Sequence, residues 1–555
     1  MAETTITSSP VNAPDVLMNL PLSRQVNVEL ESKILEPVSH NYTSATGGRT
    51  TFNFPAAGVL DSKNAALIFQ LTSLETNDSI AYNFAVGGAG CIRQMTCRIG
   101  GNIASQITNC GQYMNIKQNF MPQEIQEGVM DARHCSSHGL ALNTAMAKIQ
   151  TSGDGAGGAA SLGYQQLYNP EADQTSGYEG AYNADNIGGN GHKVQISKCL
   201  SNAVNQSPEI VIRLGDVFEL FNESAPKLPL MAMALVQIDI EWNPCGDPNV
   251  AAANITENVV IDANIPDSAL NAGPAPAVRG VVSMSTPNMI LDYIHYDDVE
   301  RQKIIDAVNS PGGMRMDFSE VLYTRGVNPA GTGTQQVRSN HILGMAMKEV
   351  KKIYVTKQYD KNSAVGSNEI NNDATLTGPK IHRNELCKQF VSQQIFGESY
   401  NFFLNNQRIY DNDVSNPMVQ HDYLAQCHKN YAVPNIYYDT SNYNANKMRI
   451  ALDAEFAGGV VGGDLLNAGA THRYLPGSQH IIGLNLDKYN SLGSVPGNGV
   501  RLGSAPLEFN YSRLAVAAGD SVSGAAHLAE VLLDFFIVYR RSLIIQPLGV
   551  NVSDA

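Results

Sequence analysis

The sequence is poor in charge and in basic residues. Only 16% of its 555 residues are charged, and the net charge is −15. Nucleic-acid binding needs clustered Lys and Arg that displace counterions from phosphates, so this balance argues against direct contact with nucleic acid. No stretch approaches the 18 consecutive apolar residues of a membrane-spanning helix. Residues 1–24 have neither a positive start nor an apolar core, so we expect no secretory signal.

Cysteine is also sparse. The eight cysteines lie far apart along the chain, without the density of a secreted disulfide scaffold. We therefore expect reduced, buried thiols and a protein that folds in the cytosol.

Sequence motifs for catalysis and for metal or phosphate binding are missing. There is no Gly-x-Ser-x-Gly, no His-Glu-x-x-His and no Gly-x-x-x-x-Gly-Lys-Ser/Thr. Two groups of His and Cys lack the paired-ligand spacing of a structural zinc site: His134, Cys135 and His138, and His421, Cys427 and His428. Acidic neighbours are expected by chance in a chain with 52 carboxylates, as at Asp297-Asp298 and at Asp411 and Asp413. We predict no catalytic residue, no metal ligand and no cofactor.

Short strands separated by turn residues dominate the chain, with 48 Gly and 25 Pro between them. Apolar residues alternate with polar ones in TTFNFP (50–55), in ALIFQL (66–71) and in LVQIDIEW (235–242). The last of these predicts a strand with one wet face, formed by Gln237, Asp239 and Glu241. The unbroken apolar run near residues 531–546 predicts a strand buried on both faces. The pattern predicts an all-β protein.

The division of the chain follows its composition. A chain of this length exceeds one hydrophobic core, and residues 246–277, rich in Pro, Ala and Asn, read as a linker. We predict an N-terminal arm (1–24), a first β domain (25–245), a second (278–547) and a C-terminal tail (548–555). Two long loops, residues 152–193 and 357–381, are predicted to be functional surface or locally disordered.

One stretch, LDYIHYDDVERQKI (291–304), passes from an apolar strand to a charged segment without a turn residue. Asp297 is placed to cap a short helix, with Glu300 at its third position, as in a capping box. Asp298 adds favourable charge at the start of the helix. Asp297 and Glu300 are therefore predicted structural cap residues.

Four stretches resemble major capsid proteins of the double-jelly-roll lineage of double-stranded DNA viruses, which includes virophages, polinton-like viruses and nucleocytoplasmic large DNA viruses. LDYIHYDDVERQK (291–303) resembles the family pattern DYIYLDTDERRRF, which opens the second jelly roll. LPLMAMALVQIDIEW (228–242) is similar to the PLIALQYHEVKI stretch that closes the first. FFLNNQRIY (402–410) parallels an LNGHDRF element, with Asn406 in place of its Gly, and APLEFNYSRL (505–514) is similar to GSLNFSRID.

The resemblance implies a fold and a function. The fold is two tandem eight-stranded jelly rolls with long loop insertions and a few short helices. The function is that of a virion capsid subunit, not an enzyme: a homotrimer with the outline of a hexagon that assembles into an icosahedral shell around double-stranded DNA. The implied partners are neighbouring capsomers and penton and minor or cement capsid proteins, and assembly inside the host cell, in cytoplasm or nucleus, is implied too. The polar N-terminal arm would order only on assembly.

Two alternatives remain from the sequence. Jelly rolls also serve lectins, so the chain could be a carbohydrate-binding or host-attachment protein whose loops contact host glycans. An enzyme of cupin type would require a cluster of metal-binding His and carboxylate residues on one pair of strands.

Overall fold

The computed structural model describes residues 10–18, 26–73, 80–82, 87–118, 133, 209–222, 226–244, 260–262, 282–331, 335–345, 348–359, 392, 395, 397–404, 406–427, 481–487, 500–502, 506–515, 530–547 and 549–554. Strands predominate in this part of the chain. No helix within it is both long enough and apolar enough to cross a bilayer.

The first group of strands forms two sheets. One runs in the order β10 (Glu209–Arg213), β6 (Ala66–Ser73), β14 (Asn288–Tyr296) and β2 (Val28–Leu35), with β13 (Val282–Met284) beside β6 and β5 (Val59–Leu60) beside β14. The other runs β3 (Ser39–Thr43), β4 (Gly47–Phe54), β11 (Val236–Trp242), β8 (Ile92–Ile99) and β9 (Asn102–Thr108). A separate pair joins β7 (Ile80–Tyr82) to β12 (Val260–Asp262).

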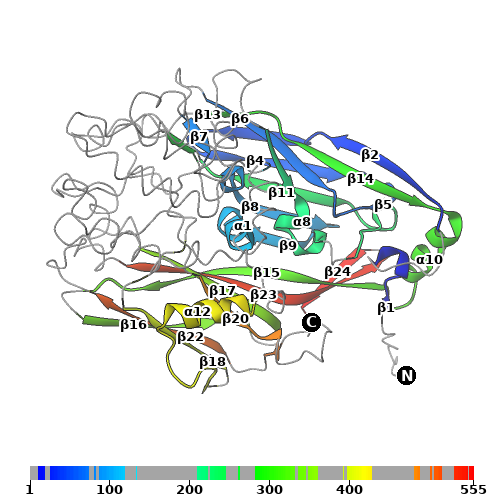
Figure 1. The fold of residues 1–555 in the computed structure, drawn as a ribbon. Coiled ribbons are helices and arrows are strands. Elements are labelled where there is room, and N and C mark those ends of the chain that lie inside the picture. The colour runs from blue at the N-terminus through cyan, green and yellow to red at the C-terminus, as the bar shows by residue number, and fades with distance from the viewer. Residues whose placement is uncertain are drawn as a thin grey trace, which may run out of the picture.

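The second group also forms two sheets. One runs β1 (Val11–Asn12), β15 (Met314–Asn328), β23 (Val531–Gln546), β17 (Glu349–Tyr359) and β20 (Ile482–Asn485), with β21 (Val500–Arg501) beside β17 and β24 (Gly549–Asp554) beside β23. The other runs β16 (Gln335–Leu343), β22 (Leu507–Ala515), β18 (Ser399–Leu404) and β19 (Gln407–Arg408). Figure 1 shows the four sheets as successive layers.

The helices that the structure describes are short. The α-helices are α1 (Cys110–Gln118), α8 (Leu214–Val217), α10 (Asp298–Val308) and α12 (Pro417–Ala425). Single turns of 3-10 helix are η1 (Asp15–Leu17), η2 (Gly87–Cys91), η7 (Glu219–Phe221) and η8 (Leu230–Ala232). Of these, α10 connects the last strand of the first group to the first long strand of the second, at one end of the molecule (Figure 1).

Both groups have the same strand order. If the eight main strands of each group are numbered along the chain, one sheet has the order 1-8-3-6 and the other 2-7-4-5. The main strands of the first group are β2, β4, β6, β8, β9, β10, β11 and β14, and those of the second are β15 to β20, β22 and β23. This order is that of a jelly roll, a sandwich of two Greek keys. The predicted fold of two tandem jelly rolls is confirmed by the strand order itself.

The alternating segments behave as predicted. In β4, Phe52 and Phe54 point into the core, and in β6 Leu67, Phe69 and Leu71 do so. The long strand β23 lies between β15 and β17, and its side chains enter two different cores. Phe536 belongs to the buried cluster of the first jelly roll and the junction, whereas Phe535 and Ile537 belong to the core of the second jelly roll. A strand covered on both faces has no wet side, which explains the nearly continuous apolar sequence of β23.

The pairing of β14 departs from the predicted division of the chain. We placed residues 278–547 in the second domain, but β14 hydrogen-bonds β2 and β6 and is the eighth strand of the first jelly roll. The stretch LDYIHYDDVERQKI therefore closes the first jelly roll and leads out of it. The seventh strand, β11, had been expected to close it. The predicted linker also contains a paired strand, β12.

Both predicted terminal segments contain ordered structure within the chain. Within the predicted arm, β1 pairs with β15, and Val16 and Leu17 are buried in the main core. Their apolar side chains explain this docking, because burying them removes apolar surface from water without a partner molecule. Within the predicted tail, β24 pairs with β23, and Val550 is buried.

Candidate functional site

The connector between the jelly rolls carries the two predicted cap residues. Asp297 stands at the N-cap of α10, and its Oδ1 accepts a hydrogen bond of 3.0 Å from the backbone N–H of Glu300. Glu300 is buried, and its Oε1 accepts a bond of 2.9 Å from Nζ of Lys303. Ile304 and Val308 face the core. Asp297 therefore caps the helix that joins the two jelly rolls, and the Glu300–Lys303 pair lies within its first turns.

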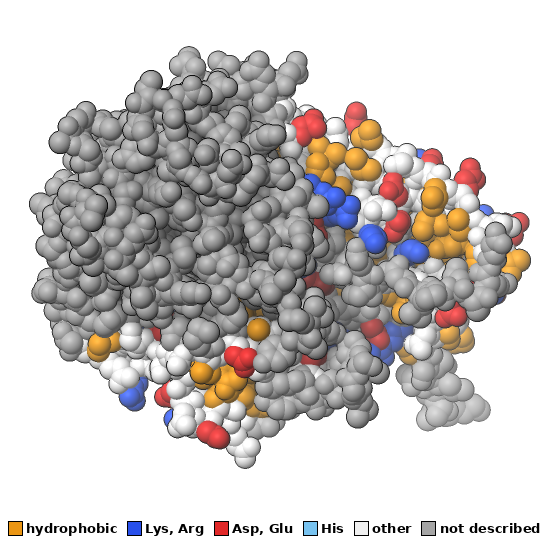
Figure 2. Space-filling model, viewed as in Figure 1, with side chains coloured by type: hydrophobic (Ala, Val, Ile, Leu, Met, Phe, Trp, Pro, Cys, Tyr) orange, Lys and Arg blue, Asp and Glu red, His pale blue; other side chains and the backbone are white. Residues whose placement is uncertain are grey.

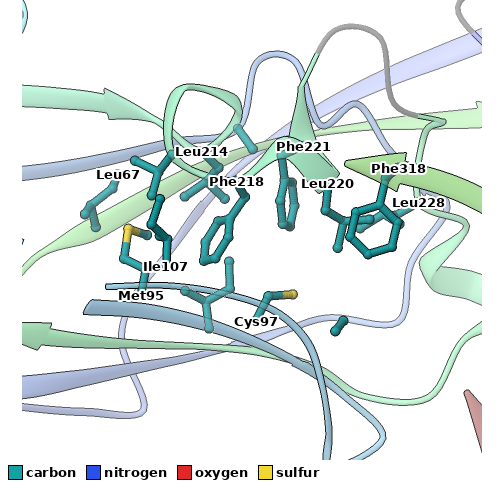
Figure 3. Close-up of a cluster of buried hydrophobic side chains, with 14 of the residues drawn as sticks. Leu67, Met95, Cys97, Ile107, Leu214, Phe218, Leu220, Phe221, Leu228 and Phe318 are labelled. Atoms are coloured by element: carbon teal, nitrogen blue, oxygen red, sulfur yellow. The ribbon is translucent and has the colours of Figure 1, made fainter. Parts of the chain in front are cut away.

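The junction between the two jelly rolls is largely apolar. Residues of β15 and β23 belong to the same buried cluster as the core of the first jelly roll. Phe318 of β15 points toward Leu220 and Phe221 of η7 (Figure 3), and η7 contacts β15. Phe536 of β23 stacks on Tyr113 of α1 with ring centroids 5.7 Å apart. Continuous packing of this kind resists relative movement of the two sandwiches, because interiors are close-packed.

A carboxylate lies inside this junction. Oε1 of Glu320, on β15, accepts a hydrogen bond of 3.2 Å from the backbone N–H of Gln106 on β9. Nη1 of Arg541, on β23, donates to the carbonyl oxygen of Ala104 at 2.9 Å and lies 3.8 Å from Oε2 of Glu320. Glu320 is only 4% exposed. These groups tie β9 of the first jelly roll to two strands of the second.

Burial changes the acidity of this group. Loss of hydration raises the pKa of Glu320 to about 7, and the Ser105 hydroxyl, the Arg541 guanidinium and backbone N–H groups oppose that rise only in part. Burial and the nearby Glu320 carboxylate also raise the pKa of the Cys97 thiol. The charge state of the junction therefore changes near neutral pH.

A second buried charge cluster lies in the core of the second jelly roll. Nζ of Lys357, on β17, is 2.6 Å from both carboxylate oxygens of Glu398, and the Tyr511 hydroxyl donates to Oε2 of Glu398 at 3.1 Å. Lys357 is fully buried. Its burial lowers the pKa of Lys357, and the Glu398 carboxylate opposes that change. No motif in the sequence indicated this pair, because its members lie 41 residues apart.

The predicted wet face of β11 contains one buried residue. Asp239 is only 4% exposed because Arg49 and Arg98 from the two neighbouring strands reach over it, at 2.8 and 3.1 Å from its Oδ2. Thr51 donates to its Oδ1 at 2.8 Å. Burial raises the pKa of Asp239, but these partners outweigh it and hold the pKa below its ordinary value. Gln237 and Glu241 are half-buried.

The other polar candidates from the sequence form no reactive site within the described residues. Asp413 accepts from the Asn401 amide at 3.2 Å and lies 3.7 Å from Arg408, and both Asp411 and Asp413 are exposed. No group of three or more potential metal ligands occurs in the part of the chain that the structure describes. His134, Cys135, His138, His428 and the side chain of His421 lie outside it, as do residues 152–193 and most of 357–381.

The described cysteines fit the expectation of reduced, buried thiols. Cys91, Cys97, Cys110 and Cys427 are buried and form no disulfide with one another. Cys427 donates to the carbonyl oxygen of Tyr423 at 3.6 Å, as a thiol does within a helix turn.

Comparisons with known proteins give likenesses only among solved structures. No family model matches the chain, and no curated protein matches it. A chain of the Sputnik virophage, solved by cryo-electron microscopy, is 14% identical with a TM-score of 0.49, over 100% of this chain and 95% of that one. A chain of the PBCV-1 virus capsid is 11% identical with a TM-score of 0.49, over 97% and 99%. The mavirus major capsid protein is 10% identical with a TM-score of 0.43, over 98% and 95%.

Proposed function

We propose that this chain is a major capsid protein, a structural subunit rather than an enzyme. The observation that carries the proposal is the duplicated jelly roll: one chain repeats the strand order 1-8-3-6 and 2-7-4-5, and a continuous apolar junction joins the two copies. Two similar sandwiches fixed side by side form a block with two equivalent building units. Such a block suits assembly, in which large interfaces between subunits supply the free energy.

The four stretches that resemble capsid proteins add support through their places in the fold. They coincide with β14 and α10, with η8 and β11, with β18 and β19, and with β22. Asn406 lies in the two-residue turn between β18 and β19 and has φ of 62°. This left-handed conformation favours Gly and is tolerated by Asn, which accounts for Asn where the family pattern has Gly.

The proposed assembly unit is a homotrimer in which six jelly rolls form a pseudo-hexagonal capsomer. Capsomers of this kind would build an icosahedral shell around double-stranded DNA, together with penton and minor capsid proteins. The net charge of −15 fits a subunit that does not bind the genome directly.

Light scattering coupled to size-exclusion chromatography tests the proposal. A trimer of the 59.8 kDa chain has a mass of 3 × 59.8, or about 179 kDa. We expect this species, or larger shells with hexagonal capsomers in negative-stain micrographs. A chain that stays monomeric at high concentration, in low and in high salt, would refute the proposed function.

A further inference from the structure

The outer face of the first jelly roll carries exposed aliphatic side chains. On the edge strand β2, Leu30 is 74% exposed, Ile34 is 73% exposed and Val28 is 50% exposed. In the antiparallel register, Leu30 lies opposite Ile294 and Ile34 opposite Ile290 of β14. Side chains directly opposite each other lie on the same side of a sheet. Ile294 itself is only 8% exposed. Ser32 and Asp292, joined by a hydrogen bond of 2.6 Å, lie on this side between the aliphatic residues. We call Val28, Leu30 and Ile34 the β2 face.

This face is separate from the core. The alternate residues of β14, Met289, Leu291 and Tyr293, are fully buried on the other side of the sheet. Apolar side chains gather on the end of the molecule that carries β2, β14 and α10 (Figure 2). Val299 of α10, 58% exposed, adds to them. An alternating strand normally turns polar residues to water, so apolar residues on both faces of a sheet indicate that both faces become covered.

The outer edge of β2 is also uncovered by any other described strand. Among the described strands, β2 pairs with β14 alone. Soluble proteins usually protect such an edge with charge, Pro or a covering segment, because unpaired N–H and C=O groups beside apolar side chains attract other chains. Glu29, Glu31 and Lys33 alternate with the β2 face and with Ser32, so the charged side chains of β2 lie on the opposite side of the strand from Leu30 and Ile34.

A second exposed aliphatic site lies on the other jelly roll. Ile342 of the edge strand β16 is 69% exposed, and Val327 of β15 is 41% exposed. In Figure 1, β16 lies at the opposite end of the molecule from β2. Two different patches at opposite ends fit a head-to-tail contact, which closes into a ring, whereas a two-fold contact would use one patch twice.

We propose that the β2 face is buried against a second copy of this chain within the trimer, where it contacts the second jelly roll of its neighbour. This inference rests on the proposed function, since it names the surface through which the proposed trimer forms. The face supplies the apolar side chains of the contact, and the hydrogen-bonded pair Ser32 and Asp292 supplies polar groups among them.

The test uses the double variant Leu30→Asp, Ile34→Asp in the full chain. Both side chains are largely exposed, so the change leaves the core intact, and circular dichroism checks the fold. The matched control is Leu235→Asp, which alters a single exposed Leu, 54% exposed, that precedes β11. We expect the wild type and the control to elute as trimers at about 179 kDa (3 × 59.8), and the double variant to elute as a folded monomer of 59.8 kDa.

The outcomes separate the two proposals. A trimeric wild type with an equally trimeric double variant overturns the interface and leaves the proposed function standing. A monomeric wild type refutes the proposed function and the interface with it. A second readout does not depend on the Asp variants: Leu30→Cys should react with a maleimide at least tenfold more slowly in the trimer than after the trimer is dissociated by dilution. Equal rates would also overturn the interface.

Discussion

Replacing Glu320 with Gln is expected to remove a pH dependence from the stability of the protein. Glu320 lies in the junction between the jelly rolls, where Gln106 and Arg541 surround its carboxyl group. Gln has the same size and can still accept the hydrogen bond from the Gln106 N–H. It cannot ionise, so the variant keeps the packing and loses the titration.

The magnitude follows from the pKa of Glu320, which burial raises from 4.5 to about 7. Because the folded state binds this proton more tightly than the unfolded state, stability from Glu320 is fully present below pH 4.5 and falls as pH rises toward 7. A difference of about 2.5 pKa units at about 1.36 kcal/mol each gives a loss of about 3 kcal/mol across that window. Above about pH 8 the loss is constant.

The assay is urea-induced unfolding of both proteins at pH 5 and pH 8, at one protein concentration because association stabilises the folded chain. Far-UV circular dichroism reports the unfolding of both jelly rolls. Fluorescence of Trp242, the single Trp, reports the unfolding of the first. The difference in unfolding free energy between Glu320→Gln and the wild type should shift by about 2.5 kcal/mol in favour of the variant from pH 5 to pH 8, because a small part of the effect is already lost at pH 5. Other titrating groups cancel in this difference.

Glu29→Gln, which removes a carboxyl group at an exposed position of β2, is the matched control and should show no such shift. The attraction between ionised Glu320 and Arg541 is already contained in the pKa of Glu320, whereas any packing cost of the substitution is the same at both pH values, so only the change between the two pH values tests the argument. An equal difference at pH 5 and at pH 8 would show that Glu320 is not the group that titrates in the junction.

Three further predictions concern stability. Asp297→Ala should lower the free energy of unfolding by about 0.5–2 kcal/mol through the lost cap, and Asp298→Ala by less; an unchanged melting temperature for Asp297→Ala would contradict the cap. Lys357→Met should cost roughly 3–5 kcal/mol because it strands the Glu398 carboxylate, and adding Glu398→Gln should restore most of it; a double variant no better than the single would refute this. Leu17→Ala should cost roughly 2–5 kcal/mol in urea unfolding, and no cost would show that residues 10–18 do not dock.

Local sequence predicted the local structure well. Alternation in ALIFQL and TTFNFP places apolar side chains on one side of each strand, whatever the neighbouring strands are. The apolar run of β23 predicted a covered central strand, and the side chain of Asp297 binds a backbone N–H only three residues away. Each of these features depends on contacts within a few residues along the chain.

The sequence could not place β14, because an apolar strand can pair within either sandwich and its own residues do not select its partners. Its pairing with β2 spans more than 250 residues, and only the closed sheet selects it. The same limit explains Asp239, which alternates like a wet residue but becomes buried when Arg49 and Arg98 from neighbouring strands reach over it.

The sequence by itself thus determined the strand content, the apolar side of most strands, the helix cap and the likeness to capsid proteins. Only the tertiary structure decided where one jelly roll ends and the next begins. It also decided that Glu320 and Lys357 are buried charges and that Leu30 and Ile34 remain exposed. The reason is physical: alternation and capping are short-range, whereas burial depends on segments far apart in the chain that meet only in the folded protein.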